Sequence, residues 1–325
     1  MPDTENQIIM QLDHLVKHYP LPRGFGSQRQ PGDIHAVDDV SLDIFQGEVL
    51  GLIGETGCGK TTLAKCMVQL TKPTSGHVYY KGKDVEGLDV ADISRRMQIV
   101  SQDPMATLNP KKTVRESIGG NLRLPGSVNQ NEVIERIEGL LDHVGLNPGY
   151  INRYPPELSG AEKQRLNLAR ALAFNPPFII FDDPFSMVDM SVQAKYLNII
   201  EEDQTKLGLT YLMISHDLSL IQHASNRVAV MYLGVIVELG GIREIFQKPL
   251  HPYTKVLLSA IPVPDPVTEK KRRRIIIEGD APSQIYPPSG CRFRTKCPFA
   301  GIICAEEKPE LREITPGHLV ACHMV

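Results

Sequence analysis

The segment with the clearest chemistry is a glycine-rich run, GETGCGKT, which extends from Gly54 to Thr61 and fits the pattern G-x-x-x-x-G-K-[ST]. It lies between a predicted strand, EVLGLIG, and a predicted helix over about 61–69. Glycines let backbone N–H groups converge on phosphate oxygens, and the start of the helix adds a partial positive charge. We expect Lys60 to reach the β- and γ-phosphates of a nucleotide and the Thr61 hydroxyl to ligate Mg²⁺. The predicted phosphate-binding residues are Gly54, Glu55, Thr56, Gly57, Cys58, Gly59, Lys60, Thr61 and Thr62.

A second element of the same chemistry is the apolar run FIIFDD, which ends in Asp182 and Asp183. An apolar strand that ends in an acid places a carboxylate at the C-terminal edge of the sheet, where it can hold Mg²⁺ beside a phosphate loop. Asp182 occupies that place. The alternative is an ordinary turn aspartate at the end of a strand.

Four cysteines near the C-terminus, Cys291, Cys297, Cys304 and Cys322, have the spacing C-x₅-C-x₆-C-x₁₇-C. Thiolates in a reducing compartment bind zinc or iron–sulfur clusters. The spacing lacks the C-x-x-C pairs of zinc ribbons, and Cys297 precedes a proline as the last cysteine of a ferredoxin motif does. An iron–sulfur cluster, zinc and unligated thiols all remain open at this point.

Length and composition restrict the class of protein. A chain of 325 residues has room for one large domain or two modest ones. Its net charge of -3 gives no general case for binding nucleic acid. The first residues do not form a secretory signal, and no apolar run approaches the ~20 residues of a membrane-spanning helix. We therefore expect a cytosolic chain with reduced cysteines, whose membrane role would depend on partner subunits.

The elements that must position these residues alternate between strands and helices, which indicates an α/β fold with a parallel, helix-covered sheet. Strands are predicted within 34–54 and in VYYKGKDV, MQIVSQDP, FIIFDD and TYLMISHD. Helices are predicted over about 61–69, 113–144, 161–174 and 192–207, the third opened by Ser159. The expected domains are a nucleotide-binding core over 1–112 and 174–250, a helical subdomain over 113–173, and an extension over 251–325. That extension is expected to begin with a Pro-rich linker and a solvated basic run over 271–274, followed by a small cysteine module.

At this point the chain closely resembles the ATPases of ABC transporters, and more narrowly the ATP-binding subunits of dipeptide and oligopeptide (peptide/nickel) importers. The resemblance covers nearly the whole chain. It rests on segments in the family's order, GETGCGKTT, VSQDPMATLNP, LSGAEKQR, FDDPFSMVD, ISHDLSLI, MYLGVIVELG and HPYTKVLLSAIP, and on a stretch similar to GCxFxxRCPxA. It implies a P-loop NTPase core with a mixed sheet, a helical signature subdomain and a small C-terminal Cys-rich module.

The resemblance also implies roles for single residues on the side of the bound nucleotide. Tyr19 matches the aromatic residue that stacks on adenine. Gln102 matches the glutamine that meets Mg²⁺ or water and couples to the membrane subunits. His216 matches the switch histidine that contacts the γ-phosphate, and Asp183 stands at the place of the catalytic base.

Three further residues match positions that act across an ATPase dimer. Ser159 and Gly160 match the signature that caps the nucleotide of the opposite subunit, and Asp189 ends the loop that crosses the interface. Two subunits would close head-to-tail on two ATP molecules, so that the γ-phosphate favours the closed state and hydrolysis releases it.

The sequence departs from the family pattern at two places. Asp183 replaces the usual glutamate, which retracts the carboxylate by more than ~1 Å, and misplacement on that scale can lower a rate on the order of a hundredfold. In the signature, Ala161 adds a Cβ and Glu162 adds a negative charge. Because each lesion touches a composite site, we favour a heterodimer with a regular sister ATPase over a homodimer. In the other interpretation both residues are tolerated and turnover is merely slow.

The function that the resemblance implies is that of a transport ATPase, which binds ATP and Mg²⁺ and energises uptake of di- or oligopeptides. The alternative is a catalytically degenerate regulatory subunit paired with an active sister. The implied partners are a second ATPase, two transmembrane permeases and, indirectly, an extracytoplasmic peptide-binding protein, with the chain peripheral at the cytoplasmic face of the inner membrane. For the four cysteines the resemblance favours a [4Fe–4S] cluster first and zinc second.

Overall fold

The computed structural model describes residues 7–21, 32–120, 122, 129–186, 190–261 and 282–325. The predicted linker and basic run, and the predicted dimer residue Asp189, lie outside these residues. The chain divides into two compact units. Unit 1 comprises Met1–Ile9, Phe45–Glu48 and Gly87–Ser215, and unit 2 comprises Met10–Ile44, Val49–Glu86 and His216–Val325. Among the described helices, none is long and apolar enough to span a membrane.

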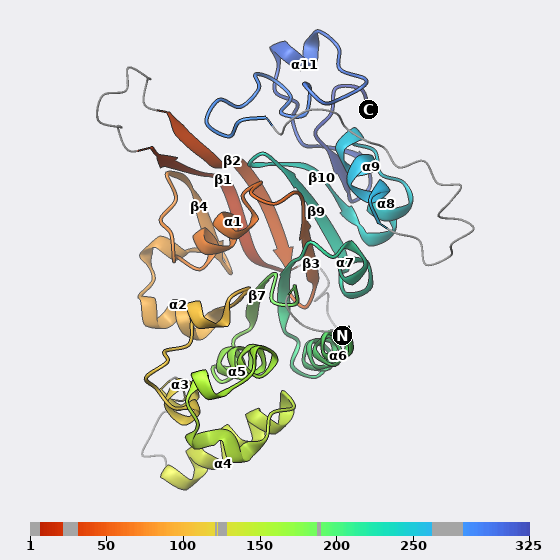
Figure 1. The fold of residues 1–325 in the computed structure, drawn as a ribbon. Helices are drawn as coiled ribbons and strands as arrows, with labels where there is room; N and C mark the ends of the chain where they lie inside the picture. Colours follow the sequence, from red (N-terminus) through yellow and green to blue (C-terminus); the bar gives the residue numbers. More distant parts are fainter. Residues whose placement is uncertain (1–6, 22–31, 121, 123–128, 187–189, 262–281) are drawn as a thin grey trace, which may run out of the picture. The chain divides into compact units, whose positions relative to one another are not determined.

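Unit 2 contains a four-stranded sheet in the order β2-β1-β4-β5 (Figure 1). Its strands are β1 (Ile8–Pro20), β2 (Asp33–Phe45), β4 (Ser75–Tyr80) and β5 (Lys83–Asp84). β4 runs antiparallel to both β1 and β5. Apolar side chains of β1 and β2, such as Leu12 and Ile44, are buried, which is the alternation expected of a sheet with one covered face.

A second group of strands in unit 2 forms a mixed sheet in the order β3-β9-β10-β12-β11. These strands are β3 (Val49–Ile53), β9 (Arg227–Tyr232), β10 (Val235–Gly241), β11 (Arg312–Thr315) and β12 (His318–Val320). β3 and β9 are parallel, whereas the other pairs are antiparallel. The helices of unit 2 are α1 (Lys60–Met67), α7 (Leu218–Ala224), α8 (Ile242–Gln247), α9 (Pro252–Ser259) and α11 (Ile303–Glu306). Figure 1 shows α8 and α9 beside β10.

Unit 1 contains three parallel strands, β6 (Met97–Ser101), β7 (Phe178–Asp182) and β8 (Thr210–Ile214), with β7 in the middle. β7 and β8 are buried along their whole length, as expected for continuous apolar runs in a parallel sheet. The register aligns Ser101, Asp182 and Ile214, so the residues that follow each strand leave the sheet at one edge.

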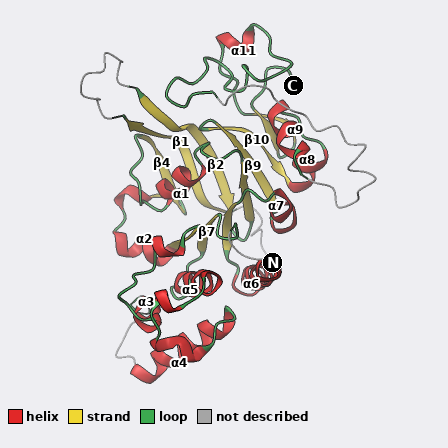
Figure 2. Cartoon of the chain, in the orientation of Figure 1, coloured by secondary structure: helices red, strands yellow, loops and turns green. Residues whose placement is uncertain are grey.

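The helices of unit 1 are α2 (Val90–Arg96), α3 (Val114–Gly119), α4 (Gln130–His143), α5 (Gly160–Leu172) and α6 (Met190–Leu207). Figure 2 shows α3, α4 and α5 grouped together. The predicted helix over 113–144 was wrong in being continuous, because α3 ends at Gly119 and α4 begins at Gln130. Consecutive glycines at 119–120 account for the end of α3.

The described part of the C-terminal extension adds strands to the core of unit 2. β12 pairs with β10 through Glu238 and Leu239, opposite Val320 and Leu319, and β11 continues the sheet beyond β12. A separate cysteine-rich module is therefore not confirmed, since this segment shares both a sheet and a compact unit with the phosphate loop.

A buried carboxylate fastens this region together. Glu238 of β10 is fully buried and accepts hydrogen bonds from the backbone N–H groups of Leu250 (2.7 Å) and His251 (3.0 Å). The ring nitrogen Nε2 of His318 lies 2.7 Å from the same carboxylate. Glu238 thus joins the start of α9 and the C-terminal strand β12 to the sheet.

The buried histidine beside this carboxylate is expected to make stability depend on pH. Burial lowers the pKa of His251 from 6.5 to about 4, and its Nδ1 accepts a hydrogen bond from the N–H of Tyr253. The unfolded chain therefore takes up a proton at higher pH than the folded chain. The contribution of neutral His251 to the free energy of unfolding should be fully present above pH 6.5. It should be lost as the pH drops towards 4, which lowers stability by up to about 3 kcal/mol. His251→Asn keeps a cap acceptor but cannot titrate, so chemical unfolding of this variant should lose that part of the pH dependence. An unchanged pH profile would contradict the assignment.

Candidate functional site

The phosphate loop, residues 54–61, has the backbone that its glycines allow. Gly54, Gly57 and Gly59 have φ values of 152°, 83° and 112°, and Gly59 is the N-cap of α1. A Cβ on Gly54 would lie 2.2 Å from the carbonyl oxygen of Met231, and one on Gly59 would lie 1.9 Å from that of Ala36. The loop is therefore packed against its neighbours and cannot accept a side chain at these two positions.

Lys60 is held inside this loop. Its side chain is only 5% exposed, and its Nζ donates hydrogen bonds to the carbonyl oxygens of Gly54 (2.7 Å) and Glu55 (2.8 Å). The ammonium group thus lies where the loop backbone converges. Thr61 is exposed and Thr62 half-buried in the first turn of α1, and burial raises the pKa of Cys58.

Two residues far along the chain support the loop from the C-terminal region. The hydroxyl of Tyr253 in α9 accepts a hydrogen bond from the N–H of Glu55 at 3.0 Å. The side-chain amide of Gln284 donates to the carbonyl oxygen of Gly57, and the backbone carbonyl of Gln284 accepts from the backbone N–H of His35. Sequence reasoning missed both residues. The HPYT segment was a signal of family only, and nothing in it indicated contact with the loop.

The other predicted nucleotide residues of unit 2 are Tyr19 and His216. Tyr19 is half-buried near the end of β1, with the Nζ of Lys17 5.0 Å from the centre of its ring. His216 is exposed and precedes α7, which is capped by Asp217. Their roles toward adenine and the γ-phosphate stay predictions.

In unit 1, Asp182 and Asp183 follow one another at the end of β7, and both are buried. Asp183 has a φ of 50°, in the left-handed region. Its N–H donates to the carbonyl of Ile214 at 2.9 Å, and the hydroxyl of Ser215 lies 3.5 Å from its Oδ1. The neighbouring strand β8 thus positions the carboxylate predicted to act as base.

Hydrogen bonds connect the backbone of the loop that begins at Asp183 to Gln102 and to the helix α5. The amide of Gln102 donates to the hydroxyl of Ser186 (3.2 Å), which donates to the carbonyl of Asp183 (3.1 Å). Gln164 of α5 is buried and donates to the carbonyls of Ser101 (3.1 Å) and Pro184 (2.7 Å). Sequence reasoning did not single out Gln164, which ties the signature helix to the loops after β6 and β7.

The signature residues form the start of α5. Ser159 is its N-cap, with a reciprocal capping box in which the Ser159 hydroxyl and N–H both lie 2.8 Å from Oε2 of Glu162. The hydrogen bonds from the backbone N–H and then the hydroxyl of Ser159 lower the pKa of Glu162. The extra negative charge that Glu162 brings to the signature is therefore bound to the helix start itself. A Cβ on Gly160 would meet nothing within 4 Å, so this position is open toward solvent within the described chain.

The four C-terminal cysteines lie in one neighbourhood but are not packed as around a single ion. The N–H of Cys291 donates to the carbonyl of Cys304 at 2.8 Å. Burial raises the pKa of Cys291, and the charges of the other three cysteines add to this. Among the described residues, no three of these sulfur atoms lie within 4.8 Å of one another, whereas tetrahedral zinc holds sulfurs about 3.8 Å apart. A cluster site is not confirmed.

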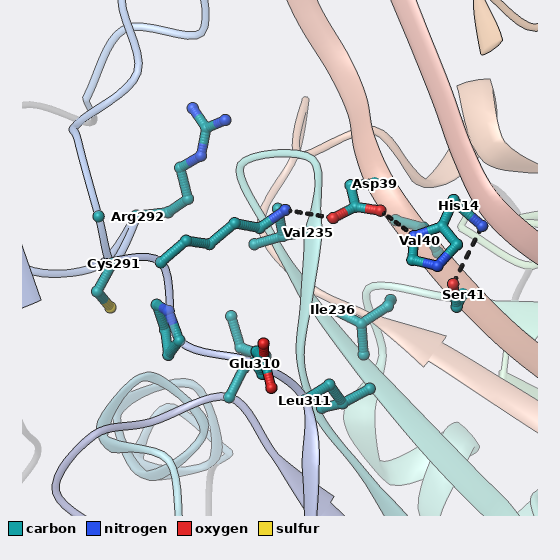
Figure 3. A pocket seen from close by; sticks show the side chains of 15 residues that line it. His14, Asp39, Val40, Ser41, Val235, Ile236, Cys291, Arg292, Glu310 and Leu311 are labelled. Carbon is teal, nitrogen blue, oxygen red and sulfur yellow. Dashed lines mark hydrogen bonds and ion pairs between the residues drawn. The ribbon is translucent and has the colours of Figure 1, made fainter. Parts of the chain in front are cut away.

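Beside Cys291 lies a cavity of about 590 Å³ in unit 2 (Figure 3). Its lining combines apolar residues, including Ile236 and Leu311, with a charged rim. In that rim, the Nζ of Lys308 lies 2.8 Å from Oδ2 of Asp39, whose other oxygen lies 2.6 Å from Nδ1 of His14. Apart from Cys291, none of the residues predicted from the sequence to bind a ligand lines this cavity.

The fold and these sites together define an ATP-binding cassette. The chain matches the family described as "ABC transporter" over residues 37–186, and "Oligopeptide/dipeptide transporter, C-terminal region" over residues 237–304. The dimeric post-hydrolysis structure of the cassette MJ0796, bound to ADP and Pi, superposes with a TM-score of 0.65 at 26% identity, covering 72% of this chain and 99% of that chain. The predicted cassette fold with a mixed sheet is confirmed.

Similar proteins identify the branch of the ABC transporter family to which the chain belongs. The chain is 45% identical to the oligopeptide transport ATP-binding protein AppF of Bacillus subtilis over 328 residues, covering 100% of this chain and 99% of that protein. It is 43% identical to the oligopeptide transport ATP-binding protein OppF of Escherichia coli, covering 97% of this chain and 96% of that protein. The chain therefore belongs to the ATP-binding proteins of oligopeptide ABC transporters. These comparisons lend no support to the alternative of a catalytically degenerate subunit.

Proposed function

We propose that this chain hydrolyses ATP to energise the import of oligopeptides, as a peripheral subunit at the cytoplasmic face of the inner membrane. The observation that carries the proposal is the construction of the phosphate loop. Lys60 donates hydrogen bonds to two carbonyls of the loop. The loop also donates a hydrogen bond to the hydroxyl of Tyr253, which lies in the region matched to oligopeptide transporters. Nucleotide chemistry and the transporter-specific region are thus parts of one unit.

In this function Lys60 exchanges its carbonyl partners for the β- and γ-phosphate oxygens when ATP binds. Thr61, Asp182 and Gln102 are the residues that would hold Mg²⁺, which would supply positive charge to neutralise the charge that develops on the phosphates. The fit is supported by the oxygen donors that Mg²⁺ prefers and by the position of Asp182 at the end of a parallel strand.

Asp183 serves as the base that orients and deprotonates the attacking water, with His216 toward the γ-phosphate. The backbone N–H of Asp183 donates to the carbonyl oxygen of Ile214, and the hydroxyl of Ser215 lies 3.5 Å from Oδ1 of Asp183. These two contacts position the shorter side chain, which supports activity with aspartate.

The test is ATP turnover by the complete complex in which the second ATPase site has been inactivated. Native Asp183 should support hydrolysis and Asp183→Glu should change the rate by less than about tenfold, while Asp183→Asn should lower it at least about a hundredfold. A native chain that binds ATP but turns it over only after Asp183→Glu would contradict the proposal.

Ser159 and Gly160 act on the nucleotide of a second ATPase subunit across a dimer. Ser159→Ala removes both the helix cap and this contact, so it should lower hydrolysis at least tenfold more than a cap loss alone. Thr113→Ala is the matched control, because Thr113 caps α3 with the same kind of capping box, with Glu116. Both variants should lose about 1 kcal/mol of stability. Equal effects of the two variants on hydrolysis would leave Ser159 with a structural role only.

For the four cysteines we propose a [4Fe–4S] cluster with a structural role, zinc being the second choice. Each of Cys291, Cys297 and Cys322 accepts a hydrogen bond from the backbone two residues later, an arrangement that suits thiolate ligands of a cluster. The cluster would supply cross-links to a segment with little core of its own. Iron and sulfide analysis of anaerobically purified chain tests this, and stoichiometric zinc without iron would exclude it.

The proposed partners are two transmembrane permeases, a peptide-binding protein outside the membrane, and a second ATPase subunit. We favour a heterodimer because Asp183 and Ala161 depart from the family pattern within composite sites. Co-purification with a different ATPase chain supports this, whereas an assembly with two copies of this chain would exclude it. Nucleic acid is not among the proposed partners.

A further inference from the structure

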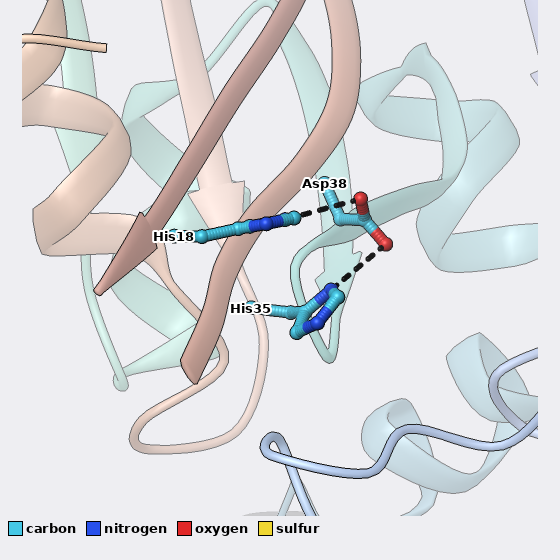
Figure 4. A group of neighbouring side chains, drawn as sticks. All are labelled: His18, His35 and Asp38. Atoms are coloured by element: carbon cyan, nitrogen blue, oxygen red, sulfur yellow. Dashed lines mark ion pairs between the residues drawn. The ribbon is translucent and has the colours of Figure 1, made fainter. Parts of the chain in front are cut away.

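Three side chains of unit 2 that no part of the proposed function uses converge on one point. His18 lies near the end of β1, and His35 and Asp38 lie near the start of β2 (Figure 4). All three are half-buried. One ligand atom from each residue lies within 4.8 Å of the ligand atoms of the other two.

Each histidine nitrogen lies near a different oxygen of Asp38, at a distance longer than a hydrogen bond and similar to that between two ligands of one metal ion. The distance from Nε2 of His18 to Oδ1 of Asp38 is 3.4 Å, and that from Nδ1 of His35 to Oδ2 of Asp38 is 3.8 Å. Both nitrogens are closed to solvent, and neither makes a hydrogen bond within the part of the chain that the structure describes. Zinc bound tetrahedrally to imidazole and carboxylate holds its ligand atoms about 3.4 Å apart.

We propose that His18, His35 and Asp38 form a binding site for a divalent transition-metal ion, with zinc as the ion that fits best. Three protein ligands leave the fourth tetrahedral position for a water molecule.

Arg292 is the charge that opposes the ion. Its guanidinium contacts Oδ2 of Asp38, which leaves Oδ1, on the side of His18, for the metal. Hydrogen bonding of a ligating carboxylate through its other oxygen is usual in metal sites. Asp33, whose charge acts on both histidines, offsets the positive charge of Arg292.

A bound ion would cross-link two strands at the ends that flank residues 22–31. It would also lie next to the phosphate loop's support, because the backbone N–H of His35 donates to Gln284, whose amide donates to Gly57. An ion that binds only the folded chain raises its stability by mass action. This inference is independent of the proposed transport function.

The test is titration of the full chain with Co²⁺, followed by visible absorption. Cobalt held by nitrogen and oxygen ligands gives visible bands, whereas cobalt held by cysteines also gives sulfur-to-cobalt bands in the near ultraviolet. Every variant below retains all the cysteines, so the two kinds of site can be told apart. The native chain should bind one equivalent of Co²⁺ that shows no sulfur-to-cobalt bands. Zn²⁺ should displace this Co²⁺ and raise the melting temperature of the chain. His18→Asn and His35→Asn should each lose this equivalent. His77→Asn should keep it, because His77 pairs with Asp84 at 2.7 Å outside any three-ligand group of the described chain.

Equal binding of sulfur-free cobalt by native chain and both histidine variants would overturn the proposal. So would the absence of any such cobalt in the native chain. Arg292→Gln leaves all three ligands in place and keeps the proposal testable if the histidine variants fold poorly. It should bind Co²⁺ at least as tightly as native chain, and loss of binding in this variant would also overturn the site.

Discussion

Replacing Lys60 with alanine is expected to lower ATP hydrolysis by at least two to three orders of magnitude, roughly the effect of removing one donor to transition-state charge. Lys60 is the buried cation of the phosphate loop, and its ammonium lies 2.7–2.8 Å from two loop carbonyls. Without it, the developing charge on the transferred phosphoryl group loses its fixed positive partner. The measurement is steady-state phosphate release by the complete complex in which the second ATPase site has been inactivated.

The matched control is Lys65→Ala, since Lys65 is an exposed lysine of the same helix α1. It should retain the native rate and the native stability. Hydrolysis by Lys60→Ala within tenfold of the Lys65→Ala rate would show that the loop is not the catalytic phosphate site.

The second large effect is expected at the buried carboxylate of Glu238. Alanine at this position leaves the N–H groups of Leu250 and His251 and the ring of His318 without their acceptor. Removing one partner of such a buried cluster costs about 3–5 kcal/mol, to be measured by chemical unfolding of the full chain. Because α9 carries Tyr253, which holds the N–H of Glu55, the affinity for ATP should fall as well.

Glu244→Ala is the control for this substitution, because Glu244 is an exposed glutamate of the neighbouring helix α8 and should change stability by less than about 0.5 kcal/mol. A double substitution with His318→Ala should cost less than the sum of the single ones, since the two residues share one interaction. Additive effects would show that the contact between Glu238 and His318 does not couple β10 to β12.

The sequence predicted the buried strands and the start of the signature helix, because these features depend on residues close together in the chain. The apolar runs before Asp182 and Ser215 are the buried strands β7 and β8, because a run of that length and burial needs a sheet covered on both faces. Ser159 begins the signature helix as expected, since a serine followed three residues later by glutamate forms a capping box.

Features that depend on partners distant in the sequence could not be predicted. β11 and β12 are short and partly polar, and their pairing depends on the free edge of β10. The bond between Glu55 and Tyr253 joins residues 198 positions apart. The sequence predicted an added negative charge at Glu162 but not where its carboxylate lies; it accepts hydrogen bonds from the backbone N–H and the hydroxyl of Ser159 at the start of its own helix.

Hydrolysis at this chain's phosphate loop is proposed to energise oligopeptide uptake. The most direct test is uptake of a labelled oligopeptide into proteoliposomes containing the complete transporter, with the peptide-binding protein inside or outside as orientation requires and ATP on the side of this chain. Uptake should need ATP, saturate with peptide, and be lost in Lys60→Ala, while Lys65→Ala should transport normally. Uptake that continues without ATP, or that is unchanged by Lys60→Ala, would contradict it.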